Sequence, residues 1–395
     1  MGETNEDETT SDVVDALVVD ELSSIDKDWE VVMSMLPVQW EAKAVELGAM
    51  RRLRGFDSVA ALLRVLLIHL ADGCSLRETA VRAKAGGLAA VSDVALLKRL
   101  RGCTAWFEWM VGQMAKDMAM PVSGEALLSG RRVRLVDGSS VCEPGATGST
   151  WRLHYALNLS TLGCDEVHVT EADVGESLTL FDLREGDLVM ADRCFATRNG
   201  LRWACQRKAD VLLRMSLSNL PLHERGSDGK PLDVLARLRT LQIGEAGEWP
   251  AAVRDKHGAI DVRVCAYKKT AAQTLATQRE IEQEARRKRS AVKPQTLESA
   301  GYVIVVTTLA EPAAASIMEF YRRRWQIELA FKRLKSLLQL GHLTKFNKDG
   351  ARAWLQGKLL VACLIEKLIL TAEHVSPWGY DAADRPRSPT ALALA

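Results

Sequence analysis

The chain has 395 residues, a formal net charge of +1 and 47% hydrophobic residues, so two or three domains with substantial cores are expected. Its eight cysteines form no Cys-x-x-Cys pair and no His pair has zinc spacing, which fits a reducing cytosol and argues against a structural zinc site. The acidic N-terminus excludes a signal peptide, and charges interrupt every apolar stretch, which excludes membrane spans.

Charge is distributed unevenly along the chain. Residues 1–30 hold eleven acidic side chains against Lys27 alone, whereas residues 321–358 hold ten Lys and Arg against two acids. The basic stripe indicates a polyanionic partner, and the acidic segment is expected to be a disordered, solvated tail. A merely soluble surface is the alternative explanation of these charges.

Residues 29–120 have a helical pattern with no convincing strand. Ser75 and Ser92 are predicted N-caps of two short helices, which the pair Gly86-Gly87 separates. The second helix ends in a basic cluster at residues 98–101, so the two helices are interpreted as a helix-turn-helix that reads DNA. An ordinary helical hairpin with a basic end is the alternative.

After Gly130 the pattern changes to strands. β-branched or alternating runs at residues 131–141, 152–161 and 166–172 predict an antiparallel meander. A short helix, a buried strand, a helix and another strand are then predicted at residues 175–183, 187–195, 197–208 and 210–217. This order is typical of a mixed α/β sheet.

Residues 219–300 are turn-rich at first and then predict a strand at 261–269 and a highly charged helix at 279–290. We interpret this segment as an insertion carried on the α/β core. A buried strand resumes at Tyr302, and the last predicted helix, 351–370, precedes a Pro-rich segment with no fold signal.

A predicted helix from Tyr321 to Leu338 carries a lone carboxylate among cations. At about 100° per residue, one sector about 80° wide holds Tyr321, Arg324, Glu328, Lys332 and Lys335. Surface pairs of Glu328 with Arg324 and Lys332, at about 0.2–0.5 kcal/mol each, explain only part of this pattern. The remaining cations and the tyrosine indicate a phosphate track beside a carboxylate.

A carboxylate among phosphates fits a divalent metal between them. Two-metal phosphodiester chemistry needs about three converging carboxylates. Asp137, followed by Gly138, and Asp192, at the end of an apolar strand, are the candidates to join Glu328. Gly138 leaves room for a backbone or ligand to approach. The alternative for each aspartate is a turn cap.

These residues resemble a known family. The spacing Tyr321-x2-Arg324-x3-Glu328-x6-Lys335 is similar to the Y-R-E-K signature of the IS-four group of bacterial insertion-sequence transposases, DDE enzymes related to the Tn-five and Tn-ten transposases. Four further segments look like family segments in the same order, across most of the chain from about Ser75 to Gly379: "RLVDGSSV", "GSTWRLHYAL", "ADRCFATRNG" and "YVIVVTTL".

The resemblance implies an α/β fold, with an RNase H-like mixed-sheet catalytic core, an inserted mostly β subdomain and an α-helical N-terminal domain. The expected organisation is a disordered acidic tail (1–28), a helical DNA-binding domain (29–127), the first segment of the RNase H-like core (128–218), an insertion subdomain (219–300), the second segment of that core with the C-terminal helices (301–375) and a flexible tail (376–395).

The resemblance also implies a DNA transposase that binds inverted-repeat ends and catalyses Mg²⁺-dependent cleavage and 3′-OH strand transfer, by cut-and-paste with a DNA hairpin as one route. Asp137, Asp192 and Glu328 would be the catalytic residues and would bind two Mg²⁺ per active site, with Mn²⁺ as a substitute. The expected partners are double-stranded DNA, of the transposon ends and of the target, and a second copy in a homodimeric paired-end complex. The expected location is the bacterial cytoplasm, at the nucleoid when DNA is bound.

The DNA contacts implied by the resemblance lie near the acids. Tyr321, Arg324, Lys332 and Lys335 would hold phosphates. Tyr302 would stack on a flipped base, although the related transposases have Trp there; a core tyrosine is the alternative. Arg193, directly after Asp192, completes the expected DNA-binding set.

Two other functions compete with an active transposase. One is an inactive or C-terminally truncated descendant that acts as a DNA-binding regulator or inhibitor of transposition, because the segment after "SPWGY" is shorter than the family pattern. The intact acidic positions argue against it. The other is an RNase H-like nuclease without strand transfer.

Overall fold

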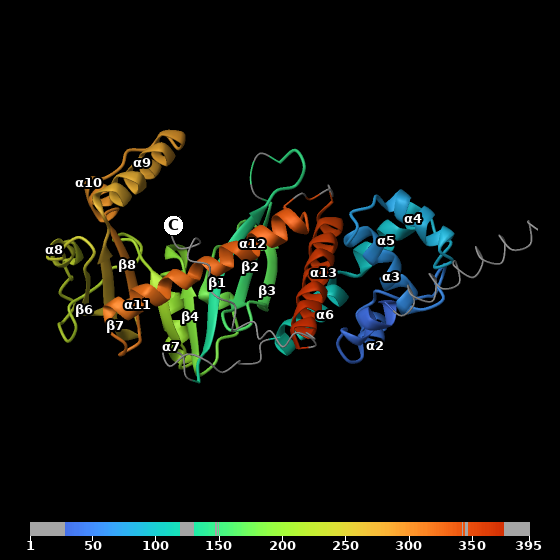
Figure 1. Cartoon of the computed structure of the whole chain (residues 1–395), viewed down its shortest axis with the longest axis horizontal. Helices are drawn as coiled ribbons and strands as arrows, with labels where there is room; N and C mark the ends of the chain where they lie inside the picture. Colours follow the sequence, from blue (N-terminus) through green and yellow to red (C-terminus); the bar gives the residue numbers. More distant parts are fainter. Residues whose placement is uncertain are drawn as a thin grey trace, which may run out of the picture. The chain divides into compact units, whose positions relative to one another are not determined.

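A computed structural model describes residues 28–118, 130–146, 148, 150–341, 343 and 347–374 (Figure 1). The expected tail at 376–395, the expected acidic tail apart from Asp28, and the expected boundary at residue 127 lie outside the described residues. The chain divides into two compact units, one of Met1–Met114 with Gln356–Ala395 and one of Ala115–Leu355. Within the described ranges, no helix combines the length and the apolar character that crossing a membrane requires.

The first unit is built of helices, as the sequence predicts. They are α2 (Trp40–Glu46), α3 (Val59–Leu70), α4 (Leu76–Ala85), α5 (Asp93–Gly102), most of α6 (Thr104–Met118) and the part of α13 (Lys348–His374) that begins at Gln356. The two predicted N-caps are confirmed: the Ser75 hydroxyl accepts from the Glu78 amide at 3.1 Å, and the Ser92 hydroxyl from the Ala95 amide at 3.2 Å.

The connection between α4 and α5 differs from a tight helix-turn-helix. It runs from Gly86 to Ser92, which is longer than the 3–4-residue turn typical of that motif. Arg99 also serves the fold itself, because its guanidinium donates to the backbone carbonyls of Arg52 and Arg54. DNA reading by this helix pair therefore stays a prediction.

The second unit contains one sheet of eight strands in the order β3-β2-β1-β4-β5-β8-β7-β6. The strands are β1 (Arg132–Val141), β2 (Trp151–Asn158), β3 (Cys164–Glu171), β4 (Asp187–Ala191), β5 (Asp210–Arg214), β6 (Ala246–Asp255), β7 (Gly258–Lys268) and β8 (Tyr302–Thr307). β1, β4 and β5 are mutually parallel, and every other neighbour pair is antiparallel. The predicted mixed sheet, including the meander of β1 to β3, is confirmed.

The inserted segment joins this sheet rather than forming a β subdomain of its own. β6 and β7 extend the core sheet beyond β8, and the three helices α8 (Val234–Arg239), α9 (Ala271–Arg287) and α10 (Pro294–Ser299) hold more residues than these two strands. The prediction of a mostly β insertion is therefore wrong. The sequence missed β6 because Pro250 and the neighbouring glycines read as turns; β6 is an edge strand, where proline is tolerated.

The predicted helix at Tyr321–Leu338 belongs to a longer helical segment that runs along the sheet (Figure 1). It consists of α11 (Ala314–Tyr321), a 3₁₀ turn (Arg322–Arg324), α12 (Trp325–Lys332) and a π-helical turn (Arg333–Leu337). Its apolar stripe is buried at Ile327, Phe331 and Leu334, and the Phe331 ring lies 5.8 Å from the Tyr155 ring of β2. This packing holds α12 against β1 and β2.

Candidate active site

The two predicted aspartates lie beside each other where the parallel pairing of β1 with β4 ends, Asp137 within β1 and Asp192 directly after β4. In the parallel pairing of β1 with β4, Val136 is opposite Ala191, so the residues that follow them, Asp137 and Asp192, are neighbours. The parallel register of β1 and β4 is why residues 55 positions apart in the chain come together. The sheet therefore brings together the two acids that the sequence singled out.

Asp137 is a partly buried carboxylate with few partners. Its side chain is 21% exposed, and its Oδ1 accepts from the Gly138 amide at 2.8 Å. Burial raises the pKa of Asp137 to about 6, and the negative charges of Glu176 and Asp192 act in the same direction, against the lowering effect of Arg324. The strand thus presents a carboxylate whose charge is only partly compensated.

Asp192 stands directly after β4, with one carboxylate oxygen unsatisfied. Its Oδ1 is buried and has no hydrogen-bond partner within the described residues; Arg214, at the end of β5, is 3.9 Å away, too far for a hydrogen bond. Asp192 precedes a 3₁₀ turn (Arg193–Phe195) but makes no side-chain cap to it. The turn-cap alternative therefore does not account for this side chain.

Glu328, on α12, is linked to Asp137 by an arginine, Arg324, that contacts both carboxylates. The Arg324 guanidinium lies 2.5 Å from the Glu328 carboxylate by one nitrogen and 3.6 Å from the Asp137 carboxylate by another. The Glu328 side chain is 37% exposed, whereas that of Arg324 is 14% exposed. Arg324 thus joins Glu328 to Asp137, and Asp137 in turn neighbours Asp192 across the β1–β4 pairing.

The donor set fits a hard divalent cation. Within the described residues, no three acidic, His or Cys side chains converge on one metal position, and the guanidinium of Arg324 stands between Asp137 and Glu328. The oxygens of Asp137, Asp192 and Glu328 are nevertheless the ligand type that Mg²⁺ and Mn²⁺ prefer. The orphaned Oδ1 of Asp192 lacks just such a partner.

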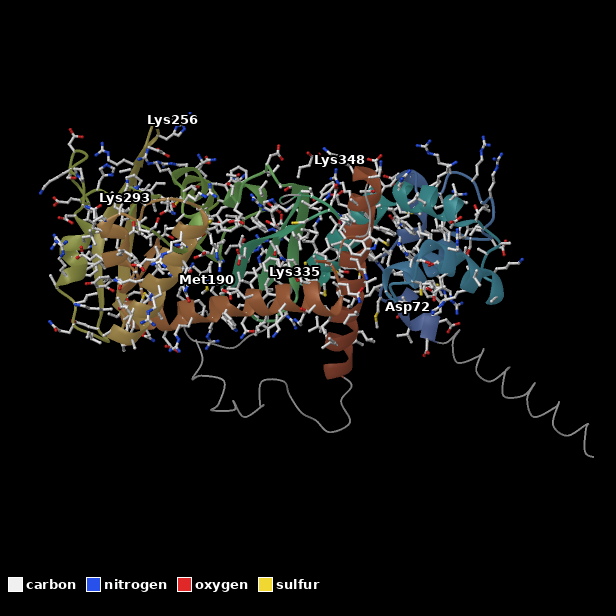
Figure 2. The ribbon with its side chains drawn as sticks, turned by 90° about the horizontal axis from the view of Figure 1, so that it is seen from above. Asp72, Met190, Lys256, Lys293, Lys335 and Lys348 are labelled. Atoms are coloured by element: carbon white, nitrogen blue, oxygen red, sulfur yellow. The ribbon has the colours of Figure 1, made fainter. Side chains whose placement is uncertain are left out.

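The predicted phosphate-holding residues occupy different settings. The Tyr321 side chain is buried, and its hydroxyl donates to the Ala191 carbonyl at 3.2 Å, so it fixes the end of β4; burial raises its pKa. The Lys335 ammonium is exposed and donates to the Ser140 carbonyl of β1 at 3.1 Å. Figure 2 shows Lys335 on the helical segment that runs beside the sheet. Lys332 is exposed on the same helix, next to a hollow lined by Leu162 and Leu337.

Tyr302 and Arg193, the other two predicted DNA contacts, are not on this helical segment. Tyr302 opens β8, is 8% exposed and belongs to the hydrophobic core, with the Lys268 ammonium 5.7 Å from its ring centre. This setting matches the core-tyrosine alternative better than an open stacking platform. Arg193 is exposed, directly beyond Asp192.

Two residues of the site were not found from the sequence. Glu176, between β3 and β4, lies against Gly138, and Arg214 faces Asp192 from β5. The glycine after Asp137 was the only signal, since it indicates a close approach, and the approaching group is the Glu176 carboxylate.

Comparison with known proteins identifies the family of the chain. Residues 129–364 match the family described as "Transposase DDE domain". The chain is 34% identical over 357 residues to the putative transposase InsL for insertion sequence element IS186A of Escherichia coli (strain K12), covering 87% of this chain and 94% of that protein. It is 34% identical over 358 residues to the transposase for insertion sequence element IS421 of Escherichia coli, with the same coverage.

Among solved structures, the chain is similar to a cryo-EM structure of the piggyBac transposase synaptic complex with hairpin DNA. The sequence identity is 11% and the TM-score is 0.46, over 89% of this chain and 74% of that chain. This likeness is too distant to carry a conclusion about the chain.

Proposed function

The chain belongs to the DDE transposase family and is a transposase enzyme, and from this premise we propose that it moves a bacterial insertion sequence. In this proposal it binds the inverted-repeat ends of the element, cleaves them in a Mg²⁺-dependent reaction, and joins the released 3′-OH ends to target DNA. The observation that carries the proposal is that Asp137 neighbours Asp192 across the β1–β4 pairing and shares Arg324 with Glu328.

We propose that the core is RNase H-like and that the chain is of the IS-four type. The support is the strand order: β1 carries the first acid, an antiparallel meander through β2 and β3 lies on one side of it, and β4 and β5 lie parallel to it on the other. The signature residues from Tyr321 to Lys335 support the type, because all four lie on one helical segment beside this sheet.

Asp137, Asp192 and Glu328 would hold the divalent cations. Such cations activate an attacking oxygen and stabilise a leaving oxygen during phosphodiester transfer. Before they bind, Arg324 compensates Asp137 and Glu328 and so limits their repulsion. When the carboxylates bind the cations instead, the planar guanidinium of Arg324 becomes available to pair with a DNA phosphate.

The other residues of the group would position the site and the DNA. Tyr321 anchors the end of β4, and with it Asp192, through the Ala191 carbonyl. Lys335, Lys332 and Arg193 would contact phosphates, since all three are cations close to the acids in sequence or structure. The base-stacking role of Tyr302 has no support from its buried setting.

Two DNA ends need two sets of these acids, so we propose that the chain works as a homodimer when the ends are paired. Cleavage through a hairpin and action at the nucleoid in the cytoplasm belong to the same proposal.

The test is cleavage of DNA that carries the element's ends, with Mg²⁺, by the variants Asp137→Ala, Asp192→Ala and Glu328→Ala. Loss of several kcal/mol of transition-state stabilisation lowers the rate by about 10²- to 10³-fold or more. Glu185→Gln, at an exposed position before β4, is the matched control and should cleave normally. Cleavage that persists in one of the three variants removes that residue from the catalytic set.

A further inference from the structure

The Glu176 side chain lies so close to Gly138 of β1 that any larger residue at position 138 would collide with it. A Cβ added to Gly138 would lie 2.4 Å from the Glu176 Oε1 and 2.8 Å from its Cδ and Cγ. Such distances are far shorter than van der Waals contact, so Gly138 is needed for this carboxylate to reach the strand directly after Asp137.

The same carboxylate also reaches the segment after Asp192. The Cys194 thiol, two residues beyond Asp192, interacts with this carboxylate, and burial together with this interaction raises the pKa of the thiol. Glu176 therefore contacts the neighbours of both aspartates, although it lies on neither of their strands.

Glu176 adds a third negative charge close to those of Asp137 and Asp192. Arg324 is shared by Asp137 and Glu328, and Arg214 is the cation nearest Asp192. Within the described residues, Glu176 forms no ion pair with a Lys or Arg. Like charges gathered without counter-ions are unfavourable, unless a cation from outside the chain joins them.

We propose that Glu176 is a fourth acidic residue of the metal-binding group, with Gly138 as the residue that admits it. The proposal rests on the proposed function, because it assumes that Asp137, Asp192 and Glu328 bind divalent cations. Glu176 would bind the metal directly or through a water molecule, and in both cases its charge strengthens metal binding.

Metal affinity of the full chain tests this without DNA or turnover. Binding of Mn²⁺ is followed by electron paramagnetic resonance of the free ion, for the wild type, Glu176→Gln, Asp137→Asn and the control Glu185→Gln. Glutamine keeps the packing against Gly138 and an acceptor for Cys194, so only the charge is lost. Glu176→Gln should weaken Mn²⁺ binding by about 10- to 100-fold, as is usual for residues that support a metal site, and Glu185→Gln should not change it.

The outcomes separate this proposal from the function. If Asp137→Asn loses Mn²⁺ and Glu176→Gln does not, the fourth acid is wrong and the proposed function stands. If the wild type binds no Mn²⁺, or Asp137→Asn binds it as well as the wild type does, the proposed function itself is contradicted.

A double variant tests the role of Gly138. Gly138→Ala should weaken Mn²⁺ binding in the wild type and have little further effect in Glu176→Gln, because the displaced charge is already absent. An equal loss in both backgrounds would show that Gly138 acts independently of Glu176. If Gly138→Ala fails to fold, Glu176→Gln alone still decides the main claim.

Discussion

The two halves of β1 carry charge in opposite ways. At the start of the strand, the Arg134 side chain is 1% exposed and bonds to Asp165, to Glu166 at 2.6 Å and to the Asp182 carbonyl at 2.9 Å. Arg132 makes two bonds to Asp187, at 2.7 and 2.8 Å. In the second half, Asp137 and its neighbour Asp192 have few hydrogen-bond partners, and the buried Oδ1 of Asp192 has none within the described residues.

The pKa values report the same difference. Burial opposes ionisation of Glu166, but its bonds from His168 and Arg134 lower its pKa to about 2. Burial raises the pKa of Asp137 to about 6, because its partners do not make up for the lost water. The charges at the start of the strand are thus paired within the chain itself. The carboxylates around Asp137 are only partly paired, as is needed at a site that binds a metal ion.

Breaking the satisfied end should have the largest effect on stability. Arg134→Met removes the cation that compensates Asp165 and Glu166 and should cost about 3–5 kcal/mol in the free energy of unfolding, measured in urea. Arg184→Met is the matched control, because its pair with Asp182 is exposed, at 58% and 71%, and is worth about 1 kcal/mol or less. Asp137→Asn, at the other end, should lose little stability without metal. A small loss in Arg134→Met would mean that this network is not what holds the strand.

The second-largest effect should come from acid, which should weaken the ion pairs of Glu166 and so destabilise the fold. A carboxylate with a lowered pKa binds fewer protons folded than unfolded, so its contribution is present above pH 4.5 and is lost as the pH falls toward 2. For Glu166 this amounts to about 2–3 kcal/mol at neutral pH. Urea unfolding from pH 7 down to pH 3 should show a loss that is smaller in Glu166→Gln, and equal losses would contradict the lowered pKa of Glu166.

The smallest effect on stability is expected at the site end. Lys335 makes one exposed hydrogen bond, to Ser140 of β1, so Lys335→Ala should unfold at nearly the wild-type urea concentration. It should still bind the element's ends more weakly, with a salt dependence shallower by about one unit. The control is Lys208→Ala, which removes an exposed cation paired with Glu185. An unchanged salt slope would make Lys335 a structural residue only.

Much of the fold followed from local patterns in the sequence. Alternating and β-branched runs located β1 to β5, β7 and β8, and serines located the starts of α4 and α5. The strand β6 was missed because Pro250 signals a turn, and only its place at the sheet edge makes it tolerable.

The candidate site was predictable only as far as chain spacing and resemblance reach. They named Asp137 and Asp192, which are neighbours on the sheet, and Glu328, which shares Arg324 with Asp137. They did not reveal that Tyr321 is buried against Ala191, since its position on the helix resembles that of Arg324. Nor did they find Glu176, whose neighbours lie far away in sequence and meet only through the sheet order.

The central claim is that three acids from separate elements hold divalent metal once Arg324 gives way. The most direct measurement is a crystal structure of the full chain with Mn²⁺ and a DNA end, with the metal located by its anomalous scattering. We expect Mn²⁺ within about 2–2.5 Å of carboxylate oxygens of Asp137, Asp192 and Glu328, with Arg324 turned away from Glu328. Mn²⁺ bound elsewhere, with Arg324 still spanning Asp137 and Glu328 beside the scissile phosphate, would contradict it.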